Sequence, residues 1–557
     1  MYNTKGAIKI KLSLDELKEA ANEMRAYALI AIHAAGSGHP GGSLSAMDFI
    51  AALYLDKLKH NPKNPHWEGR DRVFFSKAHI VPALYAALAK TGYFPVEEMM
   101  TLRKLHSPFQ GHSDMIKCSK YGVEMSGGSL GQGLGIAVGC AKAAKIDNKN
   151  YRVFCIMGDG EQQEGSVWEA AMSAHQFKLD NLVGFVDKND LQIDGWVRDI
   201  MDISPIEKKY EAFGWHVIKV NGHDIKQILA VLDEAETVKG KPTVIIAQTI
   251  KGKGVSFMEN EAGWHGKAPN REQLDKALKE LNVKSLTQDK VEHFLKYARE
   301  YSEKTEKTSL ELMPKFKRNY WWNSGNKMKV VMDPTRFGFG RCLDKKGDDE
   351  RLVTIHADIS GSIKISDFEE KHPERKNRVM STGIAEQNMM EVAAGLAKEG
   401  KIPVTGTYGV FASGRPWDQL RTTVCYANLN VKIAGAHGGI SVGPDGATHQ
   451  SLEEISIMSI LPNMHLAVPS DSIETEKACN YGFIDLKGPF YIRFGREAVP
   501  VISKEGTPYK FGIANIIRYR GEKENFIDAF DTKLSANYKS EKEDIAIIAC
   551  GAMVACP

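Results

Sequence analysis

An aspartate and an asparagine follow two neighbouring apolar runs of the chain. Asp159 comes directly after Val153–Met157, and Asn189 follows Leu182–Val186. Val167–Phe177, between the two runs, has the apolar spacing of a helix. Parallel strands of a right-handed βαβ unit end at the same edge of a sheet, so the two side chains are expected to face one crevice. A carboxylate and an amide oxygen suit Mg²⁺ or Ca²⁺, with diphosphate oxygens completing the shell.

The glycines around this aspartate fit the same chemistry. Gly158 and Gly160 let the backbone approach a ligand closely. The start of the following helix supplies partial positive charge for an anion. An ordinary strand–helix turn remains an alternative for Gly-Asp-Gly alone. The asparagine after the next strand favours a metal–diphosphate site.

Histidines recur in the loops of the same half of the chain. His39 lies in a glycine-rich helix exit, His79 follows a strand, and His112 and His265 lie in further loops. A lone histidine is more often structural or on the surface. Loops that follow the elements of one α/β domain gather at one sheet edge, so these histidines are expected to share a site.

Two tandem parallel-sheet α/β domains must position these residues. Leu12–Ala35 is expected to form a long helix with a capping box between Ser13 and Glu16. Pro242–Ile250 reads as the last strand of the first domain. Strands of the second are expected at Leu352–His356, Arg378–Ser381, Val404–Thr407, Val431–Ala434 and Pro489–Arg496.

The predicted domains are residues 1–277, a connection at 278–329, a second domain at 330–505, and a charged segment at 506–557. Within the last segment Asp544–Cys550 is expected to be the first strand of a truncated third domain.

Bulk properties exclude several classes of protein. The 557 residues carry a net charge of +3 without a concentrated basic patch, so nucleic acid is not an expected partner. The sequence lacks a signal peptide and an apolar run long enough for a membrane span. Eight scattered cysteines without a CxxC pattern indicate free thiols and a cytoplasmic protein.

Several phrases together resemble the transketolase family of thiamin diphosphate enzymes, most closely its split prokaryotic type. They are SGHPGGSLS, LGQGLGIAVG, MGDGEQQEG, NDLQIDG, GIAEQN and GPDGATHQ. The resemblance implies a diphosphate-binding domain followed by a pyrimidine-binding domain, with the third domain of the family truncated or missing.

The resemblance also implies roles for individual residues. The implied catalytic set is Glu386, His39, His79, His265, His449 and His112. Metal ligation falls to Asp159, Asn189 and Leu191. Cofactor contacts are implied for Gly128, Leu130, Gly158, Asp159, Gly160, Glu164, Asn189, His265, Asp358, Glu386, Tyr408 and Phe411. Substrate contacts are implied for Arg336, Ser362, His437, Asp445, His449 and Arg496.

The implied reaction is reversible transfer of a two-carbon ketol unit, carried on thiamin diphosphate, from a ketose phosphate to an aldose phosphate, as in the pentose phosphate pathway. The implied cofactors are thiamin diphosphate and Mg²⁺ or Ca²⁺. A homodimer with active sites between subunits is expected. Three alternatives stay open: a related enzyme with another donor or acceptor, a deoxyxylulose phosphate synthase, and a non-catalytic dimer that binds the cofactor.

Overall fold

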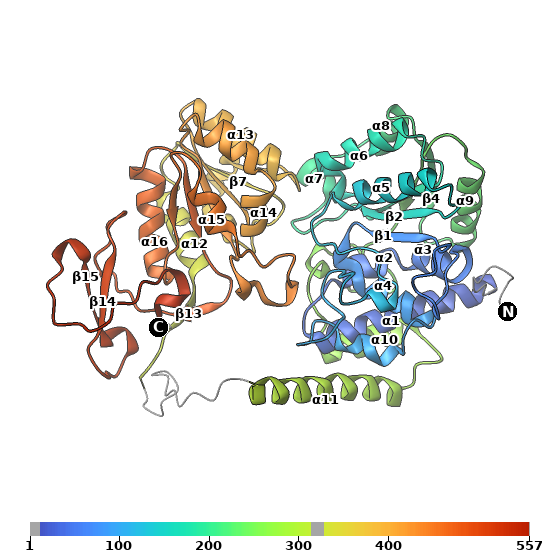
Figure 1. Cartoon of the computed structure of the whole chain (residues 1–557), viewed down its shortest axis with the longest axis horizontal. Coiled ribbons are helices and arrows are strands. Elements are labelled where there is room, and N and C mark those ends of the chain that lie inside the picture. The colour runs from blue at the N-terminus through green and yellow to red at the C-terminus, as the bar shows by residue number, and fades with distance from the viewer. Residues whose placement is uncertain (1–11, 313–327, 556–557) are drawn as a thin grey trace. The chain divides into compact units, whose positions relative to one another are not determined.

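The computed structural model describes residues 12–312 and 328–555, which fall into two compact units. The first unit is Met1–Met313 together with Pro444–Thr448. The second is Pro314–Gly443 together with His449–Pro557. Figure 1 shows helices on both faces of a sheet in each unit.

The first unit contains a five-stranded parallel sheet in the order β1-β2-β3-β5-β4. Its strands are β1 (Arg72–Phe75), β2 (Val153–Gly158), β3 (Leu182–Lys188), β4 (His216–Asn221) and β5 (Thr243–Gln248). The register pairs Gly158 of β2 with Asp187 of β3. The carboxyl ends of β2 and β3 therefore lie side by side, as predicted.

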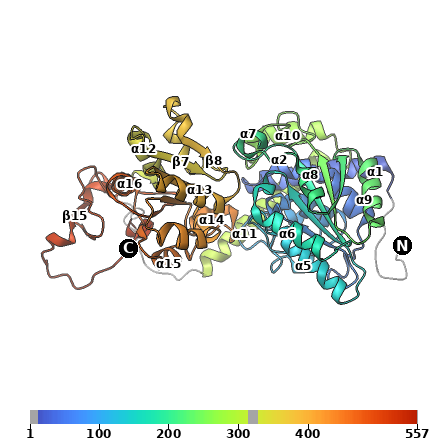
Figure 2. The same ribbon diagram turned by 90° about the horizontal axis from the view of Figure 1, so that it is seen from above.

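Alternating side chains of β2 bury both faces of this sheet. Phe154 and Ile156 pack into one core with α1 (Leu14–Ala35), α3 (Met47–Ala52), α4 (Val81–Lys90) and α9 (Ile225–Thr237). Val153, Cys155 and Met157 pack into the other with α5 (Gly133–Ile146), α6 (Gly165–Gln176) and α8 (Ile206–Ala212). Figure 2 shows the same layers from above. Burial on both faces explains the unbroken apolar runs of these strands.

The capping box predicted for α1 is confirmed. The Ser13 side chain accepts a hydrogen bond from the backbone N–H of Glu16, and the Glu16 carboxylate accepts one from the backbone N–H of Ser13. Reciprocal capping satisfies two donors at the start of the helix. The helix leads to α2 (Pro40–Ser45), which begins directly after His39.

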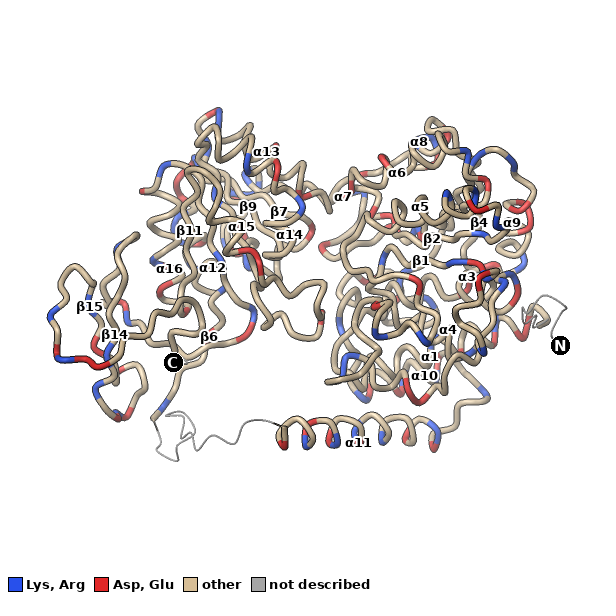
Figure 3. The backbone as a smooth tube through the Cα atoms, viewed as in Figure 1, with Lys and Arg blue, Asp and Glu red and all other residues tan. Residues whose placement is uncertain are grey.

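Two charged helices close the first unit. In α11 (Gln288–Leu312), Val291, Phe294 and Leu295 are buried in the core that contains α1. Figure 3 shows acidic and basic residues along the rest of this helix. The helix α10 (Arg271–Leu281) precedes it. The predicted connection at 278–329 thus includes a helix with a packed apolar stripe, and its residues 313–327 lie outside the described residues.

The second unit contains a six-stranded parallel sheet in the order β11-β12-β10-β9-β7-β8. Its strands are β7 (Leu352–His356), β8 (Val379–Ser381), β9 (Ile402–Tyr408), β10 (Lys432–Ala436), β11 (His465–Ala467) and β12 (Phe490–Arg493). One core includes side chains of α12 (Thr335–Lys346) and α16 (Ser472–Asn480). The other includes side chains of α13 (Glu386–Lys398), α14 (Gly409–Gly414) and α15 (Glu454–Ser459).

The end of the described chain differs from its prediction. The short strand β13 (Ala498–Pro500) pairs with β6 (Met332–Pro334), and β14 (Asn515–Tyr519) forms a hairpin with β15 (Phe530–Leu534). The strand predicted at Asp544–Cys550 is wrong for this structure, because the segment pairs with no strand among the described residues and Ile545, Ile547 and Ile548 are exposed. An apolar run alone does not make a strand without a neighbour to receive its hydrogen bonds.

A search of the described helices found none that combines the length and the apolar character needed to cross a bilayer.

Close packing of α12 against α16 generates a test. A Cβ added at Gly338 would lie 2.0 Å from the carbonyl oxygen of Ser472, whereas one added at Gly395 in α13 would meet nothing within 4 Å. Gly338→Ala should lower the free energy of unfolding by about 1–3 kcal/mol through overpacking. Gly395→Ala should raise it by up to about 1 kcal/mol, because alanine favours the helix. Denaturant titration of both variants compares them, and equal effects would contradict the packing.

Candidate active site

The Gly-Asp-Gly turn lies at the carboxyl edge of the first sheet. Asp159 is 3% exposed. Its Oδ1 accepts a hydrogen bond from the backbone N–H of Gly160 at 2.8 Å, and its Oδ2 accepts one from the N–H of Asp190 at 2.5 Å. The turn after β2 is thereby joined to the loop after β3 that contains Asn189.

The surroundings of Asp159 disfavour its negative charge. Burial, together with the nearby Asp187 carboxylate, raises the pKa of Asp159 to about 6, although two backbone N–H groups donate to it. A buried carboxylate beside a second carboxylate is short of positive charge. A cation at this position would supply it.

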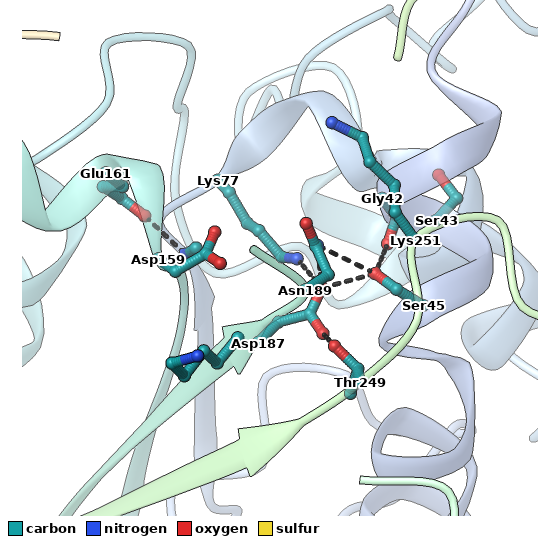
Figure 4. Close-up of polar contacts among 12 residues, drawn as sticks. Gly42, Ser43, Ser45, Lys77, Asp159, Glu161, Asp187, Asn189, Thr249 and Lys251 are labelled. Atoms are coloured by element: carbon teal, nitrogen blue, oxygen red, sulfur yellow. Dashed lines mark hydrogen bonds and ion pairs between the residues drawn. The ribbon is translucent and has the colours of Figure 1, made fainter. Parts of the chain in front are cut away.

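Asp187 is the most heavily bonded carboxylate at this edge. It is fully buried, and Figure 4 shows side chains from several loops converging on it. Its Oδ2 accepts hydrogen bonds from Lys77, from Ser45 at 2.5 Å and from Asn189 at 3.1 Å. Its Oδ1 accepts one from Thr249 at 2.5 Å. Burial alone would raise the pKa of Asp187, but Lys77 and the two hydroxyls outweigh it and hold the pKa below its usual value.

A third buried carboxylate, Glu161, joins the segments around Ser76, Gly131 and Gly158. Glu161 is 2% exposed. It accepts hydrogen bonds from the Ser76 hydroxyl, from the N–H of Gly131 at 2.8 Å and from the N–H of Gly158 at 3.0 Å. The glycine-rich segment before α5 is thus held against the ends of β1 and β2.

Sequence reasoning did not single out Asp187, Lys77 or Glu161. The available signal was position. Lys77 and Asp187, like Asp159, stand at or just after the carboxyl ends of strands that are otherwise apolar. Charged residues there face the crevice in parallel sheets.

The structure brings four predicted histidines together. The ring centroid of His39 lies 5.1 Å from that of His79, 6.0 Å from that of His112 and 5.5 Å from that of His265. The rings of His79 and His265 are 5.2 Å apart. Such a cluster provides several imidazoles for one bound molecule.

Burial and neighbouring positive groups keep two of these rings neutral. The pKa of His79 is well below its usual value because of burial, with His265 and Lys77 adding to the effect. The pKa of His265 is likewise well below its usual value because of burial and Lys251. Both rings are therefore neutral near pH 7.

Lys251 connects the histidine cluster to the loop after β3. Its ammonium donates to the carbonyl oxygens of Leu191 at 2.9 Å and Gln192 at 3.3 Å. The same ammonium lies 2.8 Å from Nδ1 of His265. An ammonium can only donate, so the neutral His265 ring carries its proton on Nε2.

Asp445 lies in Pro444–Thr448, the short segment that forms part of the first unit. Its carboxylate pairs with Arg103 at 3.3 Å, and its carbonyl oxygen lies 2.9 Å from Nδ1 of His112. Arg103 also donates to Ser37 at 2.8 Å and lies 3.4 Å from Nδ1 of His39.

The remaining predicted residues of the first unit also lie near the sheet edge or the loops around it. Gly128 has a φ of +156° and Gly131, after Leu130, a φ of +89°, backbone conformations that favour glycine. Glu164, which is buried, precedes the first residue of α6.

In the second unit, Glu386 is the first residue of α13 and is 3% exposed. Arg415 donates to its carboxylate at 2.6 Å, and Thr407 donates at 3.5 Å. The Arg415 guanidinium also lies 4.5 Å from the centre of the Phe411 ring. One arginine thus fixes a carboxylate and an aromatic ring relative to each other.

Aromatic rings and histidines of the second unit form a second cluster. The Tyr408 ring lies 4.7 Å from that of His437 and 5.8 Å from that of His449. Phe411 lies 5.2 Å from His449. Asp358, buried with a φ of +57°, follows the neighbouring strand β7.

Two arginines and a neutral histidine form a basic group in the same unit. Arg336 donates to the carbonyl oxygen of Ser362 at 2.9 Å and lies 3.2 Å from Nε2 of His437. Arg496 donates to the carbonyl oxygen of Val442 at 3.1 Å. Nε of Arg336 and Nδ1 of His437 are buried without a hydrogen-bond partner in the described chain. Burial, with Arg336 and Arg496 adding to it, lowers the pKa of His437 to about 3.

Comparison with known proteins agrees with the division of the chain into two domains. Residues 16–329 match the family "Transketolase, thiamine diphosphate binding domain", and residues 334–501 match "Transketolase, pyrimidine binding domain". The transketolase of Pongo abelii is 34% identical over 514 residues, which cover 90% of this chain and 78% of that protein. The chain belongs to the transketolase family.

Two further relatives differ in how much they share with this transketolase-family chain. The 6-deoxy-6-sulfo-D-fructose transketolase subunit SqwG of Clostridium sp. (strain MSTE9) is 44% identical over 266 residues, 48% of this chain and 96% of that subunit. A crystal structure of the Campylobacter jejuni transketolase is 28% identical, covers 91% of this chain and 82% of that one, and superposes with a TM-score of 0.47.

Family membership makes the chain a thiamin diphosphate-dependent transferase with two tandem parallel-sheet α/β domains. The first domain is the thiamin diphosphate-binding domain.

The residues at the sheet edge fit a divalent metal. Asp159 and Asn189 have side-chain oxygens there, and the carbonyl oxygen of Leu191, which accepts from Lys251, has a second lone pair. Within residues 12–312 and 328–555, no group of three or more His, Cys, Asp or Glu side chains could hold a metal by itself. A hard cation here would need oxygens from a bound diphosphate, which is how Mg²⁺ is commonly held.

The neutral state of His437 predicts an acid-sensitive contribution to stability. The folded pKa lies below the unfolded value of about 6.5, so between about pH 6.5 and pH 3 the unfolded chain binds an extra proton. The contribution of neutral His437 to the free energy of unfolding is fully present above about pH 6.5. By pH 5 the free energy of unfolding is lower by about 2 kcal/mol.

His437→Asn removes this proton-linked loss, and asparagine tolerates the φ of +56° at the position. Denaturant titrations at pH 7 and pH 5 should show a smaller drop for the variant by about 2 kcal/mol. An equal drop in both chains would show that His437 is protonated in the folded state.

Proposed function

We propose that this chain catalyses reversible transfer of a two-carbon ketol unit from a ketose phosphate to an aldose phosphate. The observation that carries the proposal is the cluster of four histidines in the unit that also holds Asp159 and Asn189. Sugar phosphates have many hydroxyl protons to bind and move, and imidazoles suit both tasks.

Asp159, Asn189 and the carbonyl group of Leu191 would hold Mg²⁺, with Ca²⁺ as the alternative ion. Backbone groups of Gly158 and Gly160 would face the diphosphate. When bound, thiamin diphosphate supplies a stabilised carbanion at the former carbonyl carbon of the donor. Further contacts with it are proposed for Gly128, Leu130, Glu164, His265, Asp358, Glu386, Tyr408 and Phe411.

The proposed proton transfers and hydroxyl contacts are divided among the clustered histidines. His79 is neutral and would accept a proton from a substrate hydroxyl. His265, whose Nδ1 lies 2.8 Å from the Lys251 ammonium, would instead donate a hydrogen bond from Nε2 to a substrate oxygen. His39, His112 and His449 would orient hydroxyl and carbonyl oxygens of the substrates. Asp445 would accept a hydrogen bond from a hydroxyl group of the ketose phosphate. Glu386 would hold a pyrimidine ring nitrogen, with Phe411 stacked on the ring.

The basic group of the second unit would bind the substrate phosphate. Arg336, Arg496 and His437 all offer N–H donors, with Ser362 beside them. A donor-rich group that contains two arginines suits a tetrahedral oxyanion.

A homodimer with active sites at the subunit interface is part of the proposal. It rests on the family resemblance, because the chain has both the diphosphate-binding and the pyrimidine-binding domain of that family.

A related enzyme with a different donor is the second candidate. The 44% identity over 266 residues to a sulfosugar transketolase subunit favours it. A sulfonate is also a tetrahedral oxyanion, so the same arginines would suit it. A deoxyxylulose phosphate synthase and a non-catalytic cofactor-binding dimer are further alternatives, and the experiment below separates them.

The decisive assay supplies xylulose 5-phosphate and ribose 5-phosphate with thiamin diphosphate and Mg²⁺. Sedoheptulose 7-phosphate and glyceraldehyde 3-phosphate should form only when both cofactors are present. Product from 6-deoxy-6-sulfofructose but not from xylulose 5-phosphate would favour the second candidate. Product from pyruvate and glyceraldehyde 3-phosphate would favour the synthase, and cofactor binding without any product would favour the non-catalytic dimer.

Glu386→Gln should lower kcat by about 10²–10⁴-fold, because the variant loses a charged hydrogen-bonding partner at the cofactor. Glu391→Gln is the matched control, since Glu391 is an exposed residue of the same helix. Steady-state rates at saturating cofactor compare the two. Turnover by Glu386→Gln at the level of the control would refute the assignment.

A further inference from the structure

We infer that Asp187 is a positioning residue that fixes the side-chain amide of Asn189 with its oxygen toward the cation and its nitrogen away from it. The inference rests on the proposed metal–diphosphate site. Asp187 itself touches neither substrate nor cofactor in this assignment. It acts through the groups that it holds.

The first step is the direction of the contact between the two side chains. Nδ2 of Asn189 lies 3.1 Å from Oδ2 of Asp187 and 3.4 Å from the hydroxyl oxygen of Ser45. A carboxylate can only accept, so an Asn189 turned by 180° would place oxygen against oxygen. The carboxylate therefore selects one of two amide orientations that have nearly the same shape.

The selected orientation leaves the amide oxygen available. Oδ1 of Asn189 accepts a hydrogen bond from the N–H of Leu191 at 3.2 Å. A carbonyl oxygen has two lone pairs, so one remains for a cation. Asn189 is 6% exposed, and water cannot readily replace the contact with Asp187.

The second step is the saturation of Asp187. Its two oxygens receive four hydrogen bonds, from Lys77, Ser45, Asn189 and Thr249. Figure 4 shows Lys77, Ser45, Asn189 and Thr249 pointing toward the carboxylate. Asp187 is thereby prevented from competing with Asp159 as a metal ligand, although both carboxylates lie at the same edge.

The third step is charge. The ion pair joins Lys77, with a side chain 3% exposed, to a fully buried carboxylate. Removing one partner of such a pair leaves an uncompensated buried charge. The Lys77 ammonium thus occupies Asp187, whereas no ion pair is found for Asp159 among the described residues.

The same contacts fix loops that contain the histidines. Ser45 is the last residue of α2, which follows His39, and Lys77 lies two residues before His79. Thr249 follows β5 and lies two residues before Lys251, the ammonium that contacts His265. One carboxylate thus couples the metal loop to three of the clustered histidines.

Two double variants isolate the acceptor from the charge. Lys77→Met with Asp187→Asn removes the ion pair but keeps an oxygen that can accept from Asn189. Lys77→Met with Asp187→Leu removes the ion pair and the acceptor together. Neither variant leaves Lys77 as a lone buried ammonium.

The measurement is the Kd of Mn²⁺ in the presence of saturating thiamin diphosphate, followed by the free Mn²⁺ signal in electron paramagnetic resonance. The Lys77→Met/Asp187→Leu chain should bind Mn²⁺ about 10–100-fold more weakly than the Lys77→Met/Asp187→Asn chain, the usual effect of losing a partner of a metal ligand. Equal Mn²⁺ affinities in the two chains would overturn the inference.

A second experiment exchanges the Asp187 and Asn189 side chains, and it applies if the leucine variant does not fold. Asn189→Asp alone places two carboxylates together, whereas Asn189→Asp with Asp187→Asn restores a donor–acceptor pair in the reverse sense. The swapped chain should bind Mn²⁺ at least about tenfold more tightly than Asn189→Asp. No recovery would show that the two residues are not coupled and would overturn the inference.

Mn²⁺ binding by the wild-type chain and by a surface control variant distinguishes a failure of this inference from a failure of the proposed function. Lys208→Met with Asp199→Asn makes the same chemical changes at exposed positions and should bind Mn²⁺ as wild type does. Wild-type chain that binds no Mn²⁺ with thiamin diphosphate would refute the metal site itself. Wild-type binding with no difference between the two double variants would refute only the role of Asp187.

Discussion

The carboxyl edge of the first sheet depends on a fully buried carboxylate that has four hydrogen-bond donors. Breaking a buried ion pair by removing one partner typically costs about 3–5 kcal/mol, so the Asp187–Lys77 pair is a strong constraint on the loops that supply it. Those loops come from α2, β1, β3 and β5. The loops that carry His39, His79 and Lys251 in the same unit are held by these contacts, and Asp159 lies after the neighbouring strand.

The two units contribute different chemistry. The first concentrates buried carboxylates, backbone N–H groups and histidines at one sheet edge, which suits a cation, a diphosphate and proton transfer. The second combines Glu386, aromatic rings and two arginines, which suits a heteroaromatic ring and an anionic substrate.

The sequence predicts those parts of the site whose positions follow from the order of the strands. Asp159 and Asn189 could be placed together because a βαβ unit brings its strand ends to one edge, and the histidine loops followed from the same rule. Asp187 could not be selected, because its partners Ser45 and Lys77 lie 142 and 110 residues away and only the fold brings them close. The predicted strand at Asp544–Cys550 failed for a related reason, since strand formation depends on a neighbour that local sequence does not reveal.

The central claim is that the edge containing Asp159 and Asn189 binds a divalent metal and a diphosphate as one unit. Calorimetric titration of the chain with thiamin diphosphate, with Mg²⁺ present and with the metal chelated, tests it most directly. The account predicts at least about tenfold tighter cofactor binding with Mg²⁺ and, by linkage, an equal gain in Mg²⁺ affinity with the cofactor. Equal cofactor affinity in the two conditions would contradict it.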